Sequence, residues 1–104
     1  MTEVIQTMKV TMYGWPDNDP PGAGIAYPTL HSQAGGTGTY GDPTTMASAP
    51  GEFTPGTKVY VPYLHKYFIM EDYCADATSE WQNGIWHIDL WAGGNSSSNV
   101  NQLR

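Results

Sequence analysis

Short stretches in which polar and apolar residues alternate are the main hydrophobic pattern of this chain. In residues 2–13, Val10 and Met12 alternate with Lys9, Thr11 and Tyr13. A period of two residues is typical of a half-buried β-strand, because successive side chains of a strand point to opposite faces. We therefore predict a strand over residues 2–13, with Val10 and Met12 on one face.

Further strands are predicted in the second half of the chain, over residues 55–63, 66–74 and 85–93. The last two of these strands each carry an aspartate near the end, Asp72 and Asp89. Side chains two residues apart share a face of a strand. If the two strands pair, Asp72 and Asp89 lie on aligned faces.

The remaining segments predict turns and loops. Residues 14–24 are rich in Pro, Gly and acidic residues, and residues 25–43 read as a long loop with one short strand around Ile25 to Tyr27. Residues 75–84 can hold one helical turn, and Val100 to Leu103 a last strand or a short helix. Because no window shows a convincing helical period, the pattern predicts an all-β barrel or sandwich in a single domain over residues 1–104.

Composition and charge narrow the choice of partners. The chain has 12 Gly and 8 Pro, which favour turns and short strands over helices. Its formal net charge is −6 with only four Lys and Arg, so nucleic acid and anionic membrane surfaces are not expected partners. No apolar run approaches the roughly 20 residues of a membrane span. The single cysteine, Cys74, forms no internal disulfide, and we expect it to be a small buried residue rather than a catalytic thiolate.

Metal and cofactor signals are weak. His31, His65 and His87 are scattered without the short spacing of metal ligands. The Gly-rich stretch 35–41 lacks the Lys and the helix of a phosphate-binding loop, so we expect its glycines to form turns. We expect no metal and no cofactor.

The carboxylate in the sequence HIDLW, residues 87–91, is the strongest chemical signal. Asp89 stands between Ile88 and Leu90 in a run of large and apolar residues. Burying a carboxylate without a partner is costly, so it either accepts hydrogen bonds or holds a proton. A carboxyl group that holds its proton can act as a general acid.

Four motifs, in order, resemble those of double-psi β-barrel proteins. They lie at residues 10–19, 49–61, 67–74 and 87–90, with the sequences VTMYGWPDND, APGEFTPGTKVYV, YFIMEDYC and HIDL. The relatives that share such motifs are expansins, the rare lipoprotein A family, barrel-fold endoglucanases and the three-aspartate domain of lytic transglycosylases. The resemblance implies a six-stranded double-psi β-barrel with a polysaccharide groove, in which Asp89 is the essential acid and Asp72 matches a second aspartate.

Several residues are candidates for contact with a sugar. Aromatic faces suit sugar stacking, and a second carboxylate near Asp89 would complete a hydrolase. The predicted catalytic residues are Asp89 and Asp72, and the predicted substrate-binding residues are Tyr13, Trp15, Asp17, Asp19, Trp81 and His87. For His87 a purely structural role is an open alternative, and for the tryptophans the alternative is core packing.

The function expected from this resemblance is binding, loosening or weak cleavage of a cell-wall polysaccharide such as cellulose, chitin or peptidoglycan. Such a protein would be extracellular, in a mature form, since the opening MTEV shows no signal peptide. The alternative is a non-catalytic binding protein on the same fold, such as a cysteine protease inhibitor. Ala49 favours that alternative, because the three-aspartate pattern has an aspartate there. A structural module without glycan contact is a third possibility.

Overall fold

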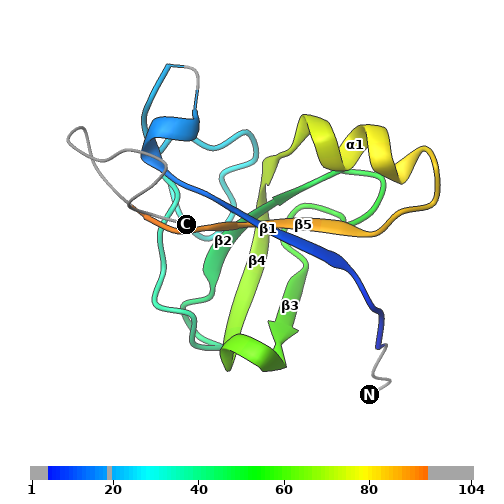
Figure 1. Ribbon diagram of the computed structural model, residues 1–104. Coiled ribbons are helices and arrows are strands. Elements are labelled where there is room, and N and C mark those ends of the chain that lie inside the picture. The colour runs from blue at the N-terminus through cyan, green and yellow to red at the C-terminus, as the bar shows by residue number, and fades with distance from the viewer. Residues whose placement is uncertain (1–4, 19, 94–104) are drawn as a thin grey trace.

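The computed structural model describes residues 5–18 and 20–93, which form a small all-β domain with one short α-helix (Figure 1). The elements, in order, are β1 Lys9–Tyr13, η1 Trp15–Asp17, β2 Thr44–Ser48, β3 Lys58–Val61, η2 Pro62–Leu64, β4 Lys66–Tyr73, α1 Ala75–Trp81 and β5 His87–Trp91. The two η elements are single 3₁₀ turns.

The strands form one mixed sheet in the order β1-β5-β2-β4-β3. Pairs β1–β5 and β2–β4 are parallel, whereas β2–β5 and β3–β4 are antiparallel. In Figure 1, β1 and β5 run across the direction of β3 and β4, so the sheet curls into a half-barrel. Curling of this kind follows from the right-handed twist of strands.

The sheet corrects the expected strand count. The described residues form five strands rather than six, and the short strand expected around Ile25 to Tyr27 is a series of bends. The first strand begins at Lys9 and not at residue 2. The predicted helical turn is present as α1, which begins after Cys74. The element expected at Val100 to Leu103 lies outside the described residues.

The central strand β2 is the element that the sequence pattern failed to predict. All of its residues, TTMAS, are buried, and it lies between β5 and β4. A strand buried on both faces shows no alternation of polar and apolar residues, so the period of two is absent. The feature of the sequence that favours a strand here is the pair of β-branched residues Thr44 and Thr45.

The hydrophobic core lies on the concave face of the curled sheet. It consists of five buried side chains, Met46, Phe68, Met70, Ile88 and Leu90. Each such side chain contributes roughly 1.5–3 kcal/mol when fully buried. The core therefore joins β2, β4 and β5, the three strands that carry the candidate site.

The apolar residues of β1 are partly exposed. Val10 and Met12 are 45% and 39% exposed, whereas Tyr13 is 6% exposed. In the register, Val10 lies opposite Ile88 and Met12 opposite Leu90, so both share the face of the sheet that carries the core. They are exposed because β1 pairs only with β5 and is an edge strand of the described sheet.

A buried ion network attaches the long loop of residues 20–43 to β4. The carboxylate of Glu71, 0% exposed, accepts hydrogen bonds from the backbone N–H groups of Leu30 (2.7 Å) and His31 (2.8 Å) and from the Thr45 hydroxyl (2.8 Å). The His31 ring contacts Glu71 at 2.9 Å and Asp42 at 2.7 Å. Burial favours a lower pKa for His31, but the bonds to Asp42 and Glu71 outweigh it and raise that pKa.

In the part of the chain that the structure describes, no helix is both long and apolar enough to cross a membrane.

Candidate functional site: a carboxylate-lined hollow

A hollow of about 340 Å³ lies where the ends of β1, β2, β4 and β5 meet the start of α1. Its lining residues are Tyr13, Asp17, Asn18, Ala47, Asp72, Tyr73, Cys74, Ala75, Asp76 and Asp89. The predicted residues Tyr13, Asp17, Asp72 and Asp89 thus come together around one cavity. Their roles remain predictions.

Ala47 separates the two predicted catalytic aspartates. In the register of the sheet, Ala47 of β2 pairs with Asp72 of β4 on one side and with Asp89 of β5 on the other. The two aspartate strands, β4 and β5, do not pair directly, since β2 lies between them. Adjacent strands are about 4.8 Å apart, so the two backbones are separated by roughly twice that distance. The small side chain of Ala47 leaves the space between the carboxylates open.

Asp72 is a buried carboxylate, 8% exposed, and both of its oxygens accept hydrogen bonds. Oδ1 accepts from the backbone N–H groups of Ala26 (3.0 Å) and Tyr73 (2.9 Å), and Oδ2 accepts from the Tyr13 hydroxyl (2.8 Å). These bonds attach β1 and the loop at Ala26 to β4. This arrangement suits a structural carboxylate, because a general base needs an oxygen that faces its substrate.

Asp89 differs from Asp72 in its exposure and in its partners. It is only half-buried, and its Oδ1 accepts a 2.8 Å hydrogen bond from the Thr11 hydroxyl. Oδ2 accepts a 4.0 Å hydrogen bond from the Cys74 thiol. Asp89 therefore lines the hollow, and Thr11 of the neighbouring strand β1 orients its carboxylate.

Behind Asp89, a chain of polar groups runs into the protein. Nε2 of His87 lies 2.7 Å from the Thr11 hydroxyl oxygen. Because that hydroxyl donates to Asp89, the proton between His87 and Thr11 belongs to the histidine nitrogen. His87 is 3% exposed and does not line the hollow, and its predicted contact with a ligand stays a prediction. Its influence on Asp89 passes through Thr11.

The chain continues from His87 to the surface. Nδ1 of His87 lies 2.9 Å from Oε2 of Glu80, and Oε1 of Glu80 is 2.6 Å from the Lys9 ammonium. His87 Nδ1 and Glu80 Oε2 are both buried, and their geometry is not that of a hydrogen bond. The contact between them is therefore electrostatic. The hydrogen bond from Lys9 lowers the pKa of Glu80.

Cys74 lies in the hollow and begins α1. Its sulfur accepts a 3.4 Å hydrogen bond from the backbone N–H of Ala77. Burial and the nearby charge of Asp89 raise the pKa of the Cys74 thiol. A raised pKa keeps the thiol protonated at neutral pH, which argues against a nucleophilic cysteine.

The remaining predicted residues lie apart from the hollow or outside the described residues. Trp15 is half-buried at the start of η1, and Trp81 packs edge-to-face against Trp86 with ring centroids 4.6 Å apart. Neither tryptophan lines the hollow, and their predicted role as sugar platforms stays a prediction. Asp19 lies outside the described residues.

Sequence reasoning missed other residues of the site. Tyr73, which is 46% exposed, and Asp76 line the hollow, and Thr11 orients Asp89. Their positions in the sequence could have identified two of them, because Tyr73 directly follows Asp72 and Thr11 shares a strand face with Tyr13.

Several carboxylates line this hollow, yet no group of three or more His, Cys, Asp or Glu among residues 5–18 and 20–93 is placed to hold a metal ion.

The fold and the hollow define a small all-β domain with carboxylates gathered at one end of a curled sheet. The chain belongs to the family described as the DDB_G0273701 N-terminal domain, whose model matches residues 5–104. It is 50% identical over 88 residues to the "Uncharacterized protein DDB_G0273701/DDB_G0273221" of Dictyostelium discoideum. The match covers 84% of this chain and 39% of that relative, so this chain spans well under half of the relative's length.

Proposed function

We propose that this domain binds a cell-wall polysaccharide in the carboxylate-lined hollow, with Asp89 as its acidic group. The observation that carries the proposal is the contrast between the two aspartates. Asp89 is half-buried and lines the hollow, whereas Asp72 is 8% exposed and accepts hydrogen bonds from Tyr13 and two backbone amides. The more exposed carboxylate is the better placed to meet a ligand, and the more buried one supports the fold.

This contrast favours chemistry with a single acid over hydrolysis with two carboxylates. Glycoside hydrolases generally need a second carboxylate as nucleophile or base. Asp72 does not suit that role because it is only 8% exposed, and Asp17 already accepts a 2.7 Å hydrogen bond from the Gly14 backbone. A single acid suffices where the sugar supplies its own nucleophile.

The proposed step conserves atoms and protons. Asp89 in its protonated form donates to the glycosidic oxygen, and the bond from that oxygen to the anomeric carbon breaks. A hydroxyl group of the same sugar attacks the anomeric carbon, and its proton passes to the Asp89 carboxylate. The product is an anhydro sugar, and Asp89 returns to its starting form.

Exposed aromatic surface beside Asp89 supports sugar binding. Tyr73 is 46% exposed and lines the hollow, and the ring of Tyr13 packs edge-to-face against Trp91 at 5.3 Å. Tyrosine offers a flat apolar face with a polar tip at low entropic cost. We place the first sugar contact at Tyr73.

The finer fold belongs to the same proposal. Two parallel strand pairs, β1–β5 and β2–β4, lie in one strongly curled sheet. This mixture supports, within the proposal, a double-psi β-barrel related to expansins and the rare lipoprotein A family. A polysaccharide of the cell wall as ligand also implies an extracellular location, which localisation of a tagged protein tests.

Product release from defined polysaccharides tests the proposal. Peptidoglycan, cellulose, chitin and xylan are incubated with the wild type, Asp89→Asn and Asp76→Asn, and soluble products are identified by mass spectrometry. Asp76 is a matched control because it is an exposed aspartate that lines the same hollow on α1. Anhydro fragments that disappear only in Asp89→Asn support the acid role.

Binding to the same polysaccharides, measured by co-sedimentation, tests the weaker form of the proposal. Retention of the wild type that falls in Asp89→Asn and not in Asp76→Asn supports a binding domain without cleavage. If the protein neither releases fragments from any of the four polysaccharides nor binds them, the proposal is wrong.

A cysteine protease inhibitor is a second candidate, favoured by the well-anchored segment after β1. The backbone of Trp15 donates to Gly93 at 3.0 Å and accepts from Gly22 at 3.0 Å, and Asp17 accepts from Gly14. A rigid surface segment is a usual feature of pre-organised inhibitors. This candidate predicts inhibition of papain that Asp89→Asn leaves unchanged.

A further inference from the structure

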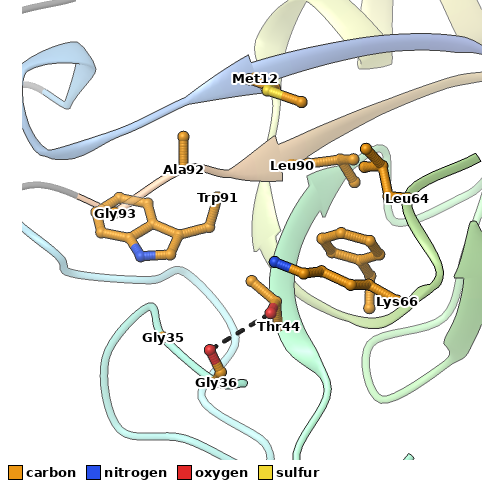
Figure 2. Close-up of a pocket in the computed structure, with 11 residues that line it drawn as sticks. Met12, Gly35, Gly36, Thr44, Leu64, Lys66, Leu90, Trp91, Ala92 and Gly93 are labelled. Carbon is orange, nitrogen blue, oxygen red and sulfur yellow. Dashed lines mark hydrogen bonds between the residues drawn. The ribbon is translucent and has the colours of Figure 1, made fainter. Parts of the chain in front are cut away.

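A second hollow, of about 570 Å³, is lined by residues of β1, β2, β4 and β5 and of the neighbouring loops (Figure 2). It is lined by Met12 and Leu90, the strand neighbours of Tyr13 and Asp89, which line the first hollow. Trp91 of the second hollow packs edge-to-face against Tyr13 of the first, so the two hollows are neighbours. Among the described residues none lines both, and a ligand in the second hollow does not depend on the function proposed above.

The walls of this second hollow are mainly apolar. Its lining residues are Met12, Gly35, Gly36, Thr44, Leu64, Lys66, Phe68, Leu90, Trp91, Ala92 and Gly93. The volume falls within the range of roughly 300–1,000 Å³ that small-molecule sites usually have. No acidic residue is among the lining residues in the described part of the chain, although the protein carries a net charge of −6.

Lys66 is the single charged group among these lining residues. In Figure 2 its side chain extends across the pocket toward Thr44 and Trp91. Of the lysines in the described residues, Lys9 pairs with Glu80, and Lys58 lies 4.1 Å from the centre of the Tyr40 ring and bonds the Tyr40 carbonyl. Lys66 makes no such ion pair or ring contact within that part of the chain.

The stem of Lys66 lies close to a glycine. Gly38 is buried, with φ of 88°, and a Cβ atom added there would lie 2.9 Å from the Cγ and Cδ atoms of Lys66. Its carbonyl also accepts a 2.7 Å hydrogen bond from the backbone of Tyr67. A glycine at this position therefore leaves room for the lysine stem beside the backbone.

We propose that this hollow binds a small apolar carboxylate, an organic anion with an aromatic or aliphatic body. The carboxylate accepts a charge-assisted hydrogen bond from Lys66, and the body packs against Phe68, Leu90 and Trp91. Charge complementarity carries the choice of an anion, because within residues 5–18 and 20–93 Lys66 forms no ion pair and no acidic residue lines this hollow.

A matched pair of probes tests the charge and the body separately. The ¹⁵N-labelled full chain is titrated with 4-phenylbutyrate and with 4-phenylbutanol, which share one apolar body. The amide signals of Gly35, Gly36 and Gly93 report on the walls of the hollow. We expect phenylbutyrate to shift these signals and to bind about fivefold more tightly than the alcohol, as one partly exposed charge pair allows.

Two variants link the preference to Lys66. Lys66→Met keeps the length of the stem and removes the charge, so it should bind both probes equally. Lys58→Met, an exposed lysine on β3 away from the hollow, should keep the preference for the acid. Circular dichroism of both variants checks the fold.

The proposal is overturned if neither probe shifts the glycine signals at millimolar concentration, if both probes bind the wild type equally, or if Lys66→Met keeps the preference for the acid. Added salt gives a further measurement. It should weaken the binding of phenylbutyrate and leave phenylbutanol unchanged, and an equal effect on both probes would contradict an ionic contact.

Discussion

The hydroxyl of Thr11 donates a 2.8 Å hydrogen bond to Oδ1 of Asp89, although 78 residues separate the two positions in the chain. The same hydroxyl lies 2.7 Å from Nε2 of His87, so one threonine connects a buried histidine with a half-buried carboxylate. Parallel pairing of β1 with β5 brings them together, with Thr11 directly opposite Asp89 in the register.

Replacing Thr11 by Val should destabilise the domain by about 1–3 kcal/mol. The substitution keeps the shape of the side chain but removes the bond to Asp89 and leaves Nε2 of His87 without an acceptor. Urea denaturation measures the free energy of unfolding. Thr29→Val is the control, since the exposed Thr29 hydroxyl bonds only the nearby Tyr27 carbonyl, and it should change stability by less than about 0.5 kcal/mol. Equal effects of the two variants would contradict a structural role for the Thr11 bridge.

Replacing Tyr13 by Phe should separate the role of Asp72 from that of Asp89. The variant removes the 2.8 Å bond to Oδ2 of Asp72 in a buried site, so we expect a loss of about 1–3 kcal/mol. Any glycan binding or cleavage should persist, because Asp89 keeps its partner Thr11. A loss of activity in a variant that remains folded would show that Asp72 takes part in the chemistry.

The network of His31, Glu71 and Asp42 should make stability depend on pH. The pKa of His31 is raised in the folded state, so its contribution is complete below its ordinary value of about 6.5 and is lost as pH rises through the raised value. The pKa values of Asp42 and Glu71 are lowered, for Asp42 by the bond from His31 and for Glu71 by its hydrogen bonds against the effect of burial. Their contribution is lost as pH falls through the lowered values. The network is therefore strongest between these limits.

Denaturation of the wild type between pH 5 and 9 should show a decline in stability above about pH 6.5 that His31→Gln removes. His65→Asn is the matched control: His65 is an exposed histidine with φ of 53°, a conformation that Asn tolerates. If His31→Gln keeps the alkaline decline of the wild type, His31 is not its source.

The raised pKa of the Cys74 thiol should make this cysteine slow to alkylate. With iodoacetamide at pH 8, the folded protein should react about tenfold or more slowly than the same chain unfolded in urea, because only the thiolate reacts and part of the side chain is covered. Asp89→Asn should narrow this difference, since the Asp89 charge is one cause of the raised pKa. Equal rates for the folded and unfolded chains would contradict this environment.

The strands that the sequence predicted well are those with one polar and one apolar face or a long apolar run. Strands β3, β4 and β5 fall within the predicted segments, and Asp72 and Asp89 lie near their expected strand ends. The prediction failed at β2, because a central strand with both faces covered has no alternating pattern. It also failed to show that Val10 and Met12 are partly exposed, which follows from the place of β1 at the edge of the described sheet.

The sequence by itself determined an all-β domain of short strands, and it pointed to Asp89, because these depend on local alternation and on a carboxylate in an apolar run. Only the tertiary structure decided that Ala47 stands between Asp72 and Asp89 and that the two carboxylates differ in their partners. Asp72 receives its hydrogen bond from Tyr13, 59 residues away, and Asp89 receives one from Thr11, 78 residues away. Strand order and register bring such distant partners together. Both depend on the packing of the whole sheet, so they cannot be predicted from the spacing of residues along the chain.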